Sequence, residues 1–541
     1  MTSPIETPVL VVGGGPVGMT LALNLARYGV RSILIERNPT TTASPKMDLT
    51  NGRTMELFHR LGLSAALRAA GVPEENSFDI AWITSLSGHQ LHRFHYPSAK
   101  EMREKSRANN DGSHTREPPM RVSQVVIEPV LKRAVDDNPL IDVRFSTAFE
   151  RLVEQDADGV RAEIRSANGK IEIVRCRFLA GCDGGGSRVR RQLDIELDGD
   201  LGVGQAYMVH FRSDDREFLQ RWGATWHYQS AIGTMIAQND HDIWTLQCLG
   251  LPGVDRDTLN PAEVLEAWAG RPFNYEILQA NPWDAHFVVA QAFHVGRVAL
   301  AGDAAHQFVP TGGYGMNSGI ADAAALSWKL TAMIQGWGDL SLLAAYEAER
   351  KPTAWMHLAA SARHVGVRIA IGQVFAEAGE LDGADSGAAA RRVATGSKIA
   401  ALGNIENESW GVEHGYRYDD SPIIVHEADP PPVDPITYRP STWPGARLPH
   451  VFLTDGDSVH DKLGLYFTLL VLREMDISAF ESAAQACGVP LRVAKVTEPG
   501  LRIIYERDLL LVRPDQHVAW RGDSVPNDCV ILLQKIVGCG S

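Results

Sequence analysis

The chain has 541 residues, of which 44% are hydrophobic and 22% charged; this is ordinary for a soluble globular protein and predicts two or three domains with large buried cores. The formal net charge of −14 excludes a general nucleic-acid-binding surface, because such a surface needs a basic face. The sequence has no apolar stretch of about 18 residues, so no membrane span is expected.

The first predicted element is a buried strand over residues 9–12, which runs into the turn GGGPVG and then a helix over 19–28. A second strand over 32–35 ends at Glu36. The glycines fill the pattern G-x-G-x-x-G between a strand and a helix, and Glu36 lies near the position of the acid that binds a ribose in dinucleotide folds. The unit therefore predicts dinucleotide binding. Its predicted cofactor-binding residues are Gly13, Gly15, Pro16, Val17, Gly18, Glu36 and Arg37.

A second turn of glycines and an acid follows a buried strand over 178–181. Asp183 lies at the end of this strand, and Ser187 is suited to cap the short helix that begins after it. In isolation, this pattern also fits a tight turn with a solvated aspartate. Its repetition beside a nucleotide-binding unit favours a role for Asp183 in binding the same ligand.

The third such turn is the most informative. A buried strand over 298–301 ends in Gly302-Asp303, and a glycine-rich loop then leads to a long helix over about 317–335. Side chains at the strand ends of an α/β sheet commonly face a ligand, and a helix start offers backbone N–H groups and the positive end of its dipole. The arrangement suits a flavin, with the polyhydroxyl chain near Asp303 and the partly anionic ring near the helix.

With these three motifs in order, the chain resembles the single-component flavoprotein aromatic hydroxylases, the family of para-hydroxybenzoate hydroxylase and phenol hydroxylase. The segments GGGPVG with Glu36, CDGGGSRVR and GDAAHQFVPTGGYGMNSGIADA are similar to the three flavin motifs of that family, over about residues 5–400. The resemblance implies an α/β fold with a discontinuous Rossmann-like FAD-binding domain, which takes residues 1–75, 119–194 and 286–400.

The resemblance also implies which residues contact FAD. Asp303 matches the residue that binds the ribityl chain, and Pro310 matches the proline beside the oxygen-reacting face. Lys46 stands where family members usually have an arginine that contacts the flavin phosphates. The other positions that match cofactor contacts are Arg121, Gln124, Asp183, Gly302, Gly313, Gly315, Met316 and Asn317.

The reaction that the family implies is hydroxylation of a small phenolic substrate with O₂ and NADPH or NADH, through a flavin C4a-hydroperoxide. The protein then positions the substrate, excludes water from the site and helps to ionise the phenol. One alternative is Baeyer–Villiger oxidation or epoxidation of a polyketide-type substrate by the same fold. Another is a non-catalytic FAD-binding protein.

Two inserts, over 76–118 and 195–285, are expected to cover the flavin and bind the substrate. The polar stretch from Lys100 to Pro119 in the first insert predicts a mobile surface loop and not a binding patch. The second insert predicts an antiparallel sheet, whose aromatic residues either line a pocket or pack its core. Its predicted strands cover 204–211, 223–230, 232–238 and 242–249.

Ionisation of a phenol, whose unperturbed pKa is about 10, needs a base or a proton relay. A histidine in a strand can equally be structural, and His306 in the third motif is expected to be a structural loop residue. Tyr314 lies inside the flavin loop and is expected to gate or line the pocket. The candidates for the base or relay are His210, His227, Tyr228 and Tyr314, and Pro310 joins them in the predicted catalytic set.

Residues 401–432 are predicted to form a linker that includes a run of three prolines. The segment 433–541 resembles the thioredoxin-like C-terminal domain of the phenol hydroxylase branch, and the whole chain is most similar to hydroxylases of alkylated phenols, such as hydroxyphenylpropionate hydroxylase, and of aromatic polyketides. No cysteine pair occupies a redox position, so a packing role or a homodimer is expected. Its predicted strands cover 467–471, 491–496, 508–512 and 517–521.

The six cysteines are scattered, with neither a CxxC pair nor metal-ligand spacing. Free thiols in a reducing cytoplasm and no bound metal are therefore expected. The first apolar run already forms the nucleotide-binding strand and no basic segment precedes it, so no signal peptide is expected.

Overall fold

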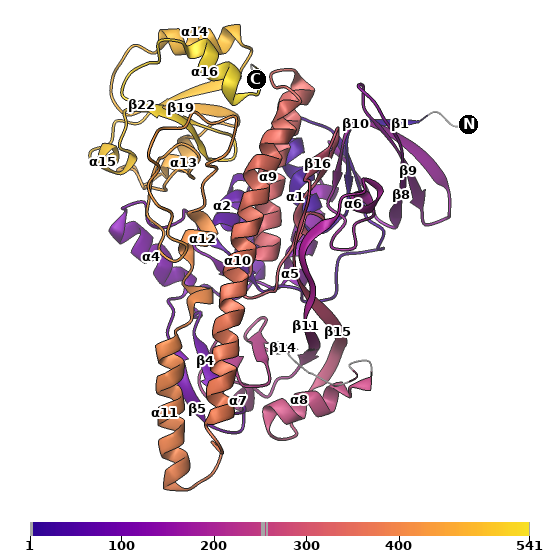
Figure 1. The fold of residues 1–541 in the computed structure, drawn as a ribbon, viewed down its shortest axis with the longest axis vertical. Helices are drawn as coiled ribbons and strands as arrows, with labels where there is room; N and C mark the ends of the chain where they lie inside the picture. The colour runs from indigo at the N-terminus through magenta and orange to yellow at the C-terminus, as the bar shows by residue number, and fades with distance from the viewer. Residues whose placement is uncertain (1–3, 250–254, 256–257, 540–541) are drawn as a thin grey trace.

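The computed structural model describes residues 4–249, 255 and 258–539, in three parts stacked along one long axis (Figure 1). The middle part is an eight-stranded sheet. Its parallel strands lie in the order β17 (Val298–Leu300), β10 (Ile171–Gly181), β1 (Ile5–Val12), β2 (Ser32–Ile35) and β7 (Ile141–Arg144). The antiparallel strands β8 (Thr147–Gln155), β9 (Val160–Ser166) and β16 (His294–Val295) complete it.

The three predicted motifs follow the carboxyl ends of three adjacent strands, β1, β10 and β17, although they are far apart in sequence. In an open parallel sheet this edge is where ligands bind. The helices after the first and third motifs, α1 (Pro16–Arg27) and α9 (Tyr314–Gln335), pack against each other, and α5 (Gln124–Asp136) covers the other side of α1. Both α1 and α9 begin three residues earlier than predicted; at α1, Pro16 occupies the first turn, where its missing N–H costs nothing.

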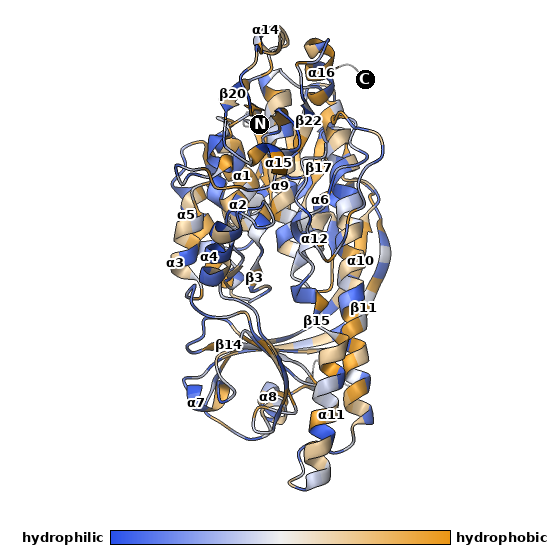
Figure 2. Ribbon diagram, turned by 90° about the vertical axis from the view of Figure 1, so that its left-hand side faces the viewer, coloured by the Kyte–Doolittle hydropathy of each residue, from blue (hydrophilic) through white to orange (hydrophobic). Residues whose placement is uncertain are grey.

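The lower part is a second eight-stranded sheet that lies across the molecule, between the nucleotide-binding part and the short helices α7 (Arg216–Leu219) and α8 (Pro261–Ala269) (Figure 2). The four strands predicted in the second insert are present, and the sheet has four further strands that were not predicted. The strand order in the lower sheet is β18 (His306–Gln307), β15 (Glu276–Ala290), β11 (Leu197–Arg212), β14 (Ile243–Leu249), β13 (Thr234–Ala237), β12 (His227–Gln229), β4 (Ile80–Ile83) and β5 (Gln90–Phe94).

The first insert differs from its prediction. The stretch that begins at Lys100 is not a loop over its whole length, because α4 (Ala99–Asn109) occupies its first half. Ser98 and Glu101 form a reciprocal capping box: the Ser98 hydroxyl accepts from the Glu101 N–H, and the Glu101 carboxylate accepts from the Ser98 N–H. Such a cap satisfies two N–H groups of the first turn and lets a polar sequence form a stable helix.

Two long helices connect the lower part to the rest of the chain. The helix α10 (Ser341–Glu377) runs the length of the lower and middle parts, and α11 (Ser386–Leu402) returns beside it and packs on β5 (Figure 1). In the part of the chain that the structure describes, no helix is both long enough and apolar enough to cross a membrane.

The upper part is a four-stranded sheet with α14 (Ser478–Ala486) and α16 (Cys529–Ile536) packed on it. Its strands start and end within one residue of the predicted bounds. The order is β20 (Leu491–Lys495), β19 (Phe467–Val471), β21 (Leu509–Val512) and β22 (Val518–Gly522), with β19 and β20 parallel and the others antiparallel.

Buried charges join the upper part to the middle part. Arg513, on the upper part, donates to both carboxylate oxygens of Glu349 on α10, at 2.5 and 2.8 Å, and Lys329 on α9 donates to the same carboxylate at 2.7 Å. All three side chains are fully buried. A second buried pair joins Arg447 to Glu56. The upper part is therefore packed onto the flavin-motif helices through charges that water cannot solvate, which supports the packing role expected of it.

The predicted linker is also more structured than expected. It contains a short 3-10 turn, Ile405–Asn407, and helix α12 (Trp410–His414), and it continues through the buried Tyr416 and Tyr418. The segment fills the seam between the three parts, because its aromatic side chains bury there and its backbone has partners on both sides.

Candidate active site

The turn after β1 is held by close backbone packing. Gly13 has a φ of 112°, and a Cβ there would lie 2.2 Å from the carbonyl oxygen of Cys182. A Cβ on Gly18 would lie 1.9 Å from the carbonyl oxygen of Gly13, whereas a Cβ on Gly15 would meet no protein atom within 4 Å. Close backbone packing thus requires glycine at positions 13 and 18. Gly15 instead leaves open space, so a phosphate can approach the backbone at the start of α1.

Glu36 is fixed at the end of β2. One carboxylate oxygen accepts from the N–H of Gly14 at 2.8 Å, and the other accepts from the N–H and the side-chain amide of Asn38 at 2.9 and 2.7 Å. The oxygen that accepts from Gly14 keeps a lone pair for a ribose hydroxyl. Arg37 lies exposed beside it.

The Asp303 turn rests on a buried charge network that the sequence did not reveal. Asp322 on α9 accepts from the N–H of Gly302 at 3.0 Å, from Nε2 of His306 at 2.7 Å and from Nε of Arg350 at 2.6 Å. His306 is completely buried, which agrees with the structural role expected for it. The network fixes the turn and turns the Asp303 side chain outward.

Asp303 itself is accessible to solvent, yet the protein around it desolvates the carboxyl and raises its pKa, against the opposing charges of His306 and Lys46. An accessible carboxylate surrounded by protein lies in a recess. This is the environment expected for a residue that accepts hydrogen bonds from a ribityl chain.

The start of α9 is open to a ligand. Gly312 and Gly313 have left-handed backbone, with φ of 87° and 67°, and a Cβ on Gly315 would meet nothing within 4 Å. The first turn of α9 carries no acidic residue, so its N–H groups and dipole are free to face an anionic group. The Asn317 amide holds the loop in place by donating to the carbonyl oxygens of Leu49 at 3.0 Å and Gly313 at 2.6 Å. Pro310 is exposed and Met316 is half-buried at the same end of the helix.

Three predicted cofactor contacts have other partners. The Arg121 guanidinium is buried against Asp240, at 2.6 and 2.9 Å, and ties the nucleotide-binding part to the lower sheet. Asp183 accepts from the Ser187 hydroxyl and two N–H groups of α6 (Arg188–Gln192), so it caps that helix together with Ser187. Gln124 donates to Glu128 at 2.7 Å. Arg121 and Asp183 thus have structural partners, and their contacts with FAD stay predictions.

The four candidate bases do not converge. Tyr228 points to the far face of the lower sheet, where its hydroxyl donates to the Gly223 carbonyl and burial raises its pKa to about 12. This placement does not support the prediction that Tyr228 acts as the base, which stays untested. Tyr314 is 1% exposed and stacks on His357 with ring centroids 5.2 Å apart, so it does not line an open pocket. His210 lies on the near face of the sheet but bonds to Thr245 at 2.9 Å.

His227 is the remaining candidate and lies at the near face of the sheet. Its Nε2 is 3.3 Å from the Asp48 carboxylate, and its ring lies at a tilt of 38° against Trp226, with centroids 4.1 Å apart. Trp226 is part of a cavity wall, so His227 lies one side chain away from an open space.

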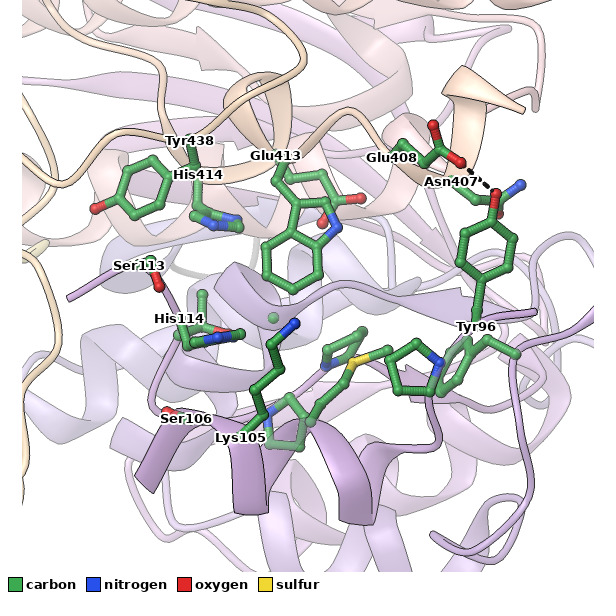
Figure 3. Close-up of a pocket in the computed structure, with 18 of the residues that line it drawn as sticks. Tyr96, Lys105, Ser106, Ser113, His114, Asn407, Glu408, Glu413, His414 and Tyr438 are labelled. Atoms are coloured by element: carbon green, nitrogen blue, oxygen red, sulfur yellow. Dashed lines mark hydrogen bonds between the residues drawn. The ribbon is translucent and has the colours of Figure 1, made fainter. Parts of the chain in front are cut away.

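This space is a cavity of about 470 Å³ between α4 and the seam segment (Figure 3). Its floor is apolar and includes Leu49, Phe78 and Trp226. A Cβ on Gly313 would lie 3.4 Å from the Leu49 side chain, so the cavity lies against the α9 loop. The polar side chains labelled along its walls are Tyr96, Lys105, Ser106, Ser113, His114, Asn407, Glu408, Glu413, His414 and Tyr438.

The sequence reasoning assigned no functional role to the cavity residues of the seam. Glu408, Glu413, His414 and Tyr438 fell in segments interpreted as a linker or as the start of the C-terminal domain. The only local signal was the density of aromatic and ionisable residues in ESWGVEHGYRY, which is unusual for a solvated linker.

Residues 6–361 match the family described as "FAD binding domain", and residues 441–538 match "Aromatic-ring hydroxylase, C-terminal". The chain belongs to the FAD-dependent aromatic-ring hydroxylases. It is 39% identical over 548 residues to the FAD-dependent monooxygenase apdD of Emericella nidulans, covering 96% of this chain and 88% of that one. It is 32% identical to the 2,4-dichlorophenol 6-monooxygenase of Cupriavidus pinatubonensis, covering 99% and 97%.

Solved structures agree with this assignment. The hydroxylase is similar to the rebeccamycin biosynthetic enzyme RebC with reduced flavin, with a TM-score of 0.88 and 33% identity over 99% of this chain and 100% of that one. It is also similar to aklavinone-11 hydroxylase in complex with FAD and aklavinone, with a TM-score of 0.81 and 27% identity over 99% and 100%. The protein is a flavoprotein monooxygenase that uses FAD, O₂ and NAD(P)H on an aromatic substrate.

The residues present fit FAD. Gly15 and Gly315 leave open backbone at two helix starts, Glu36 keeps a free lone pair, and Asp303 stands in a recess between them. These residues would hold the dinucleotide, the ribityl chain and the ring. Bound FAD supplies the electron transfer and the oxygen activation, and the protein contributes binding, orientation and exclusion of water.

Replacement of Asp303 by alanine is expected to weaken FAD binding by about 10- to 100-fold, because one charge-assisted hydrogen bond to the ribityl chain contributes about 1.5–3 kcal/mol. The purified variant should lose most of its yellow colour. Titration of the apoprotein with FAD, followed by flavin fluorescence, measures the change. Full FAD occupancy in Asp303→Ala would show that this carboxylate does not contact the ribityl chain.

Proposed function

We propose that the hydroxylase acts on a phenol larger than a single substituted ring, bound in the cavity between α4 and the seam. The observation that carries the proposal is the cavity itself: its volume of about 470 Å³ lies in the range of small-molecule sites, and its floor is apolar and aromatic. Its contact with the α9 loop through Leu49 puts it beside the expected flavin ring.

Comparison with relatives supports a large aromatic substrate. They include a protein named "Putative polyketide hydroxylase" of Streptomyces halstedii, 32% identical over 95% of this chain, and a Tetracenomycin B2 monooxygenase-dioxygenase of Streptomyces olivaceus, 31% identical over 98%. Others act on single rings, such as the dichlorophenol enzyme. The residues that line the cavity, and not the flavin motifs, should therefore decide which ring system is accepted.

In this proposal the chain's own residues do three things. The three glycine-acid turns hold the cofactor. The lower sheet and α4 close over the ring and exclude water. The cavity orients the ring carbon ortho or para to the substrate hydroxyl toward the α9 loop. Exclusion of water strengthens each polar contact inside the site and prevents wasteful loss of the activated oxygen.

The test is a panel of phenol, 2-naphthol and 1-hydroxyanthraquinone, which carry one, two and three fused rings. Oxidation of NADH and NADPH is followed with each, and the product is identified by mass spectrometry under ¹⁸O₂. We expect one ¹⁸O atom in a new ring hydroxyl and the largest stimulation with a fused-ring phenol. Stimulation by none of the three, with FAD bound, would contradict the proposal; ring expansion or an epoxide would establish the alternative oxidation.

We further propose a cytoplasmic homodimer. All six cysteines are free, which supports a reducing compartment. The C-terminal part exposes apolar side chains such as Ile503 and Ile531, which are 83% and 64% exposed and offer a contact surface. Light scattering coupled to size exclusion measures the mass, and a monomer would overturn the dimer.

A further inference from the structure

Two neighbouring ionisable side chains on α12 face the cavity without a protein partner (Figure 3). Among the residues that the structure describes, none donates a hydrogen bond to Glu413 or forms an ion pair with it; burial is the one influence on its carboxyl. His414 is 3% exposed, and neither of its ring nitrogens has a hydrogen-bond partner in the described part of the chain.

Two other charged groups of the cavity, Glu408 and Arg103, are already paired. The Tyr96 hydroxyl donates to Glu408 at 2.7 Å, and the Arg103 guanidinium binds Glu74 at 2.5 and 2.8 Å. A buried polar group without a partner costs about 1–3 kcal/mol, so a native protein retains one chiefly where a ligand, a water or the reaction uses it. The buried His414 therefore has unsatisfied ring nitrogens that a ligand can complete, and the half-buried Glu413 beside it offers a free carboxylate to the cavity.

The pair lies next to the flavin loop. Val412, the residue before Glu413, packs in one small cluster with Tyr314, the first residue of α9. The Glu413 carboxylate is close enough to Tyr314 to help raise the pKa of that phenol. The cavity touches the same loop from its other side through Leu49. A substrate that reaches Glu413 thus lies along the α9 start, where the flavin ring is expected.

The electrostatics suit a base. Burial raises the pKa of Glu413 from 4.5 to about 7, which is where a general base works best at neutral pH. Burial lowers the pKa of His414 to about 3, so this histidine is neutral and offers one donor and one acceptor. The charged groups that act on His414 from other elements are Arg447, Glu56, His114 and Arg53. Arg103, Lys105, Glu408 and Tyr438 line the same cavity, and Tyr314 of α9 lies near Glu413.

We propose that Glu413 is the catalytic base that takes the proton from the substrate's ring hydroxyl, with His414 hydrogen-bonded to the same end of the substrate. The substrate O–H bond breaks, the proton moves to the Glu413 carboxylate, and the electron pair stays on the substrate oxygen as a phenolate. The inference rests on the proposed function, because it requires a phenol in this cavity. It favours substrates with an ionisable hydroxyl at the edge of a flat ring system.

The experiment uses the FAD-loaded enzyme and the phenol that stimulates NADH oxidation most in the panel above. Wild-type kcat should rise with pH through about 7, as Glu413 loses its proton. Glu413→Gln should lower kcat at pH 7 by about 100-fold or more, since a general base contributes about 10²–10⁴. Its rate should then rise only at the higher pH where the phenol ionises by itself. Glu413→Asp, which keeps a carboxylate, should restore part of the rate and the lower inflection.

The matched comparison is Glu408→Gln, which removes the partnered carboxylate of the same cavity and should keep the inflection near 7. A Glu413→Gln enzyme with near wild-type kcat and an unchanged pH profile would overturn the inference. So would an equal loss in Glu408→Gln and Glu413→Gln, which would indicate cavity shape and not proton transfer. If wild type oxidises none of the phenols, the proposed function fails first. FAD content and thermal melting of each variant identify misfolding, and Glu413→Asp then carries the test.

Discussion

Glu349→Gln is expected to lower the free energy of unfolding by about 3–5 kcal/mol, because removal of one member of a buried ion pair leaves the other charge buried without its counter-charge. Glu349 holds Lys329 at 2.7 Å and Arg513 at 2.5 Å, with all three side chains fully buried. Arg513 keeps Asp515 at 2.6 Å, so Lys329 is the charge left without a carboxylate. Urea unfolding of the apoprotein measures the change.

A second substitution tests that explanation. Lys329→Met in the Glu349→Gln background removes the stranded charge and should recover part of the lost stability, as apolar replacement of whole buried pairs often does. Glu377→Gln is the matched control, because its side chain is 72% exposed and its pairing with Lys398 at 3.9 Å is superficial. Equal unfolding midpoints for Glu349→Gln and Glu377→Gln would contradict the argument.

The same pair predicts an acid dependence. Burial alone would raise the pKa of Glu349, but Arg513 and Lys329 hold it at about 2, below the ordinary 4.5. A carboxyl with a depressed folded-state pKa stabilises the fold above its unfolded pKa and loses that effect as pH falls through the folded one. The stability difference between wild type and Glu349→Gln should therefore shrink as pH falls from about 4.5 toward 2.

Asp322→Asn is expected to lower both stability, by about 3 kcal/mol or more, and FAD affinity. Asp322 is the buried carboxylate under the Asp303 turn, and it alone pairs Arg350 at 2.6 Å while holding the Gly302 N–H at 3.0 Å. The Arg350 charge keeps the pKa of Asp322 well below its usual range. Loss of the Asp322 charge leaves the buried Arg350 without this counter-charge. It also weakens the contacts that fix the turn and direct Asp303 at the cofactor.

Two readouts separate these effects. Urea unfolding reports stability and FAD titration reports affinity, and Asp322→Asn should change both, whereas Asp303→Ala should change only the second. Asp136→Asn removes a carboxylate from an exposed pair with Lys132 and should change neither by more than about 1 kcal/mol. Wild-type FAD affinity in Asp322→Asn would show that the turn does not depend on this network.

The flavin motifs were predictable because each is a local pattern. At Gly13 and Gly18, a Cβ would collide with neighbouring backbone, so only glycine fits. An acid follows each of β2, β10 and β17 within three residues. Four strands of the lower sheet and the four strands of the C-terminal sheet were also predictable from hydrophobic runs. The strand β15 was missed because it is half-exposed over most of its length and carries a proline, so its sequence lacks a buried run.

The sequence by itself determined the cofactor, the fold class and the reaction class, because the backbone geometry that binds FAD is encoded within short segments. Only the tertiary structure decided which side chains meet: Glu349 and Arg513 are 164 positions apart, and Glu413 belongs to a segment that looked like a linker. The physical reason is that a buried charge or an unpaired base is defined by what packs around it. The local sequence pattern of a segment does not indicate which residues from distant parts of the chain pack against it.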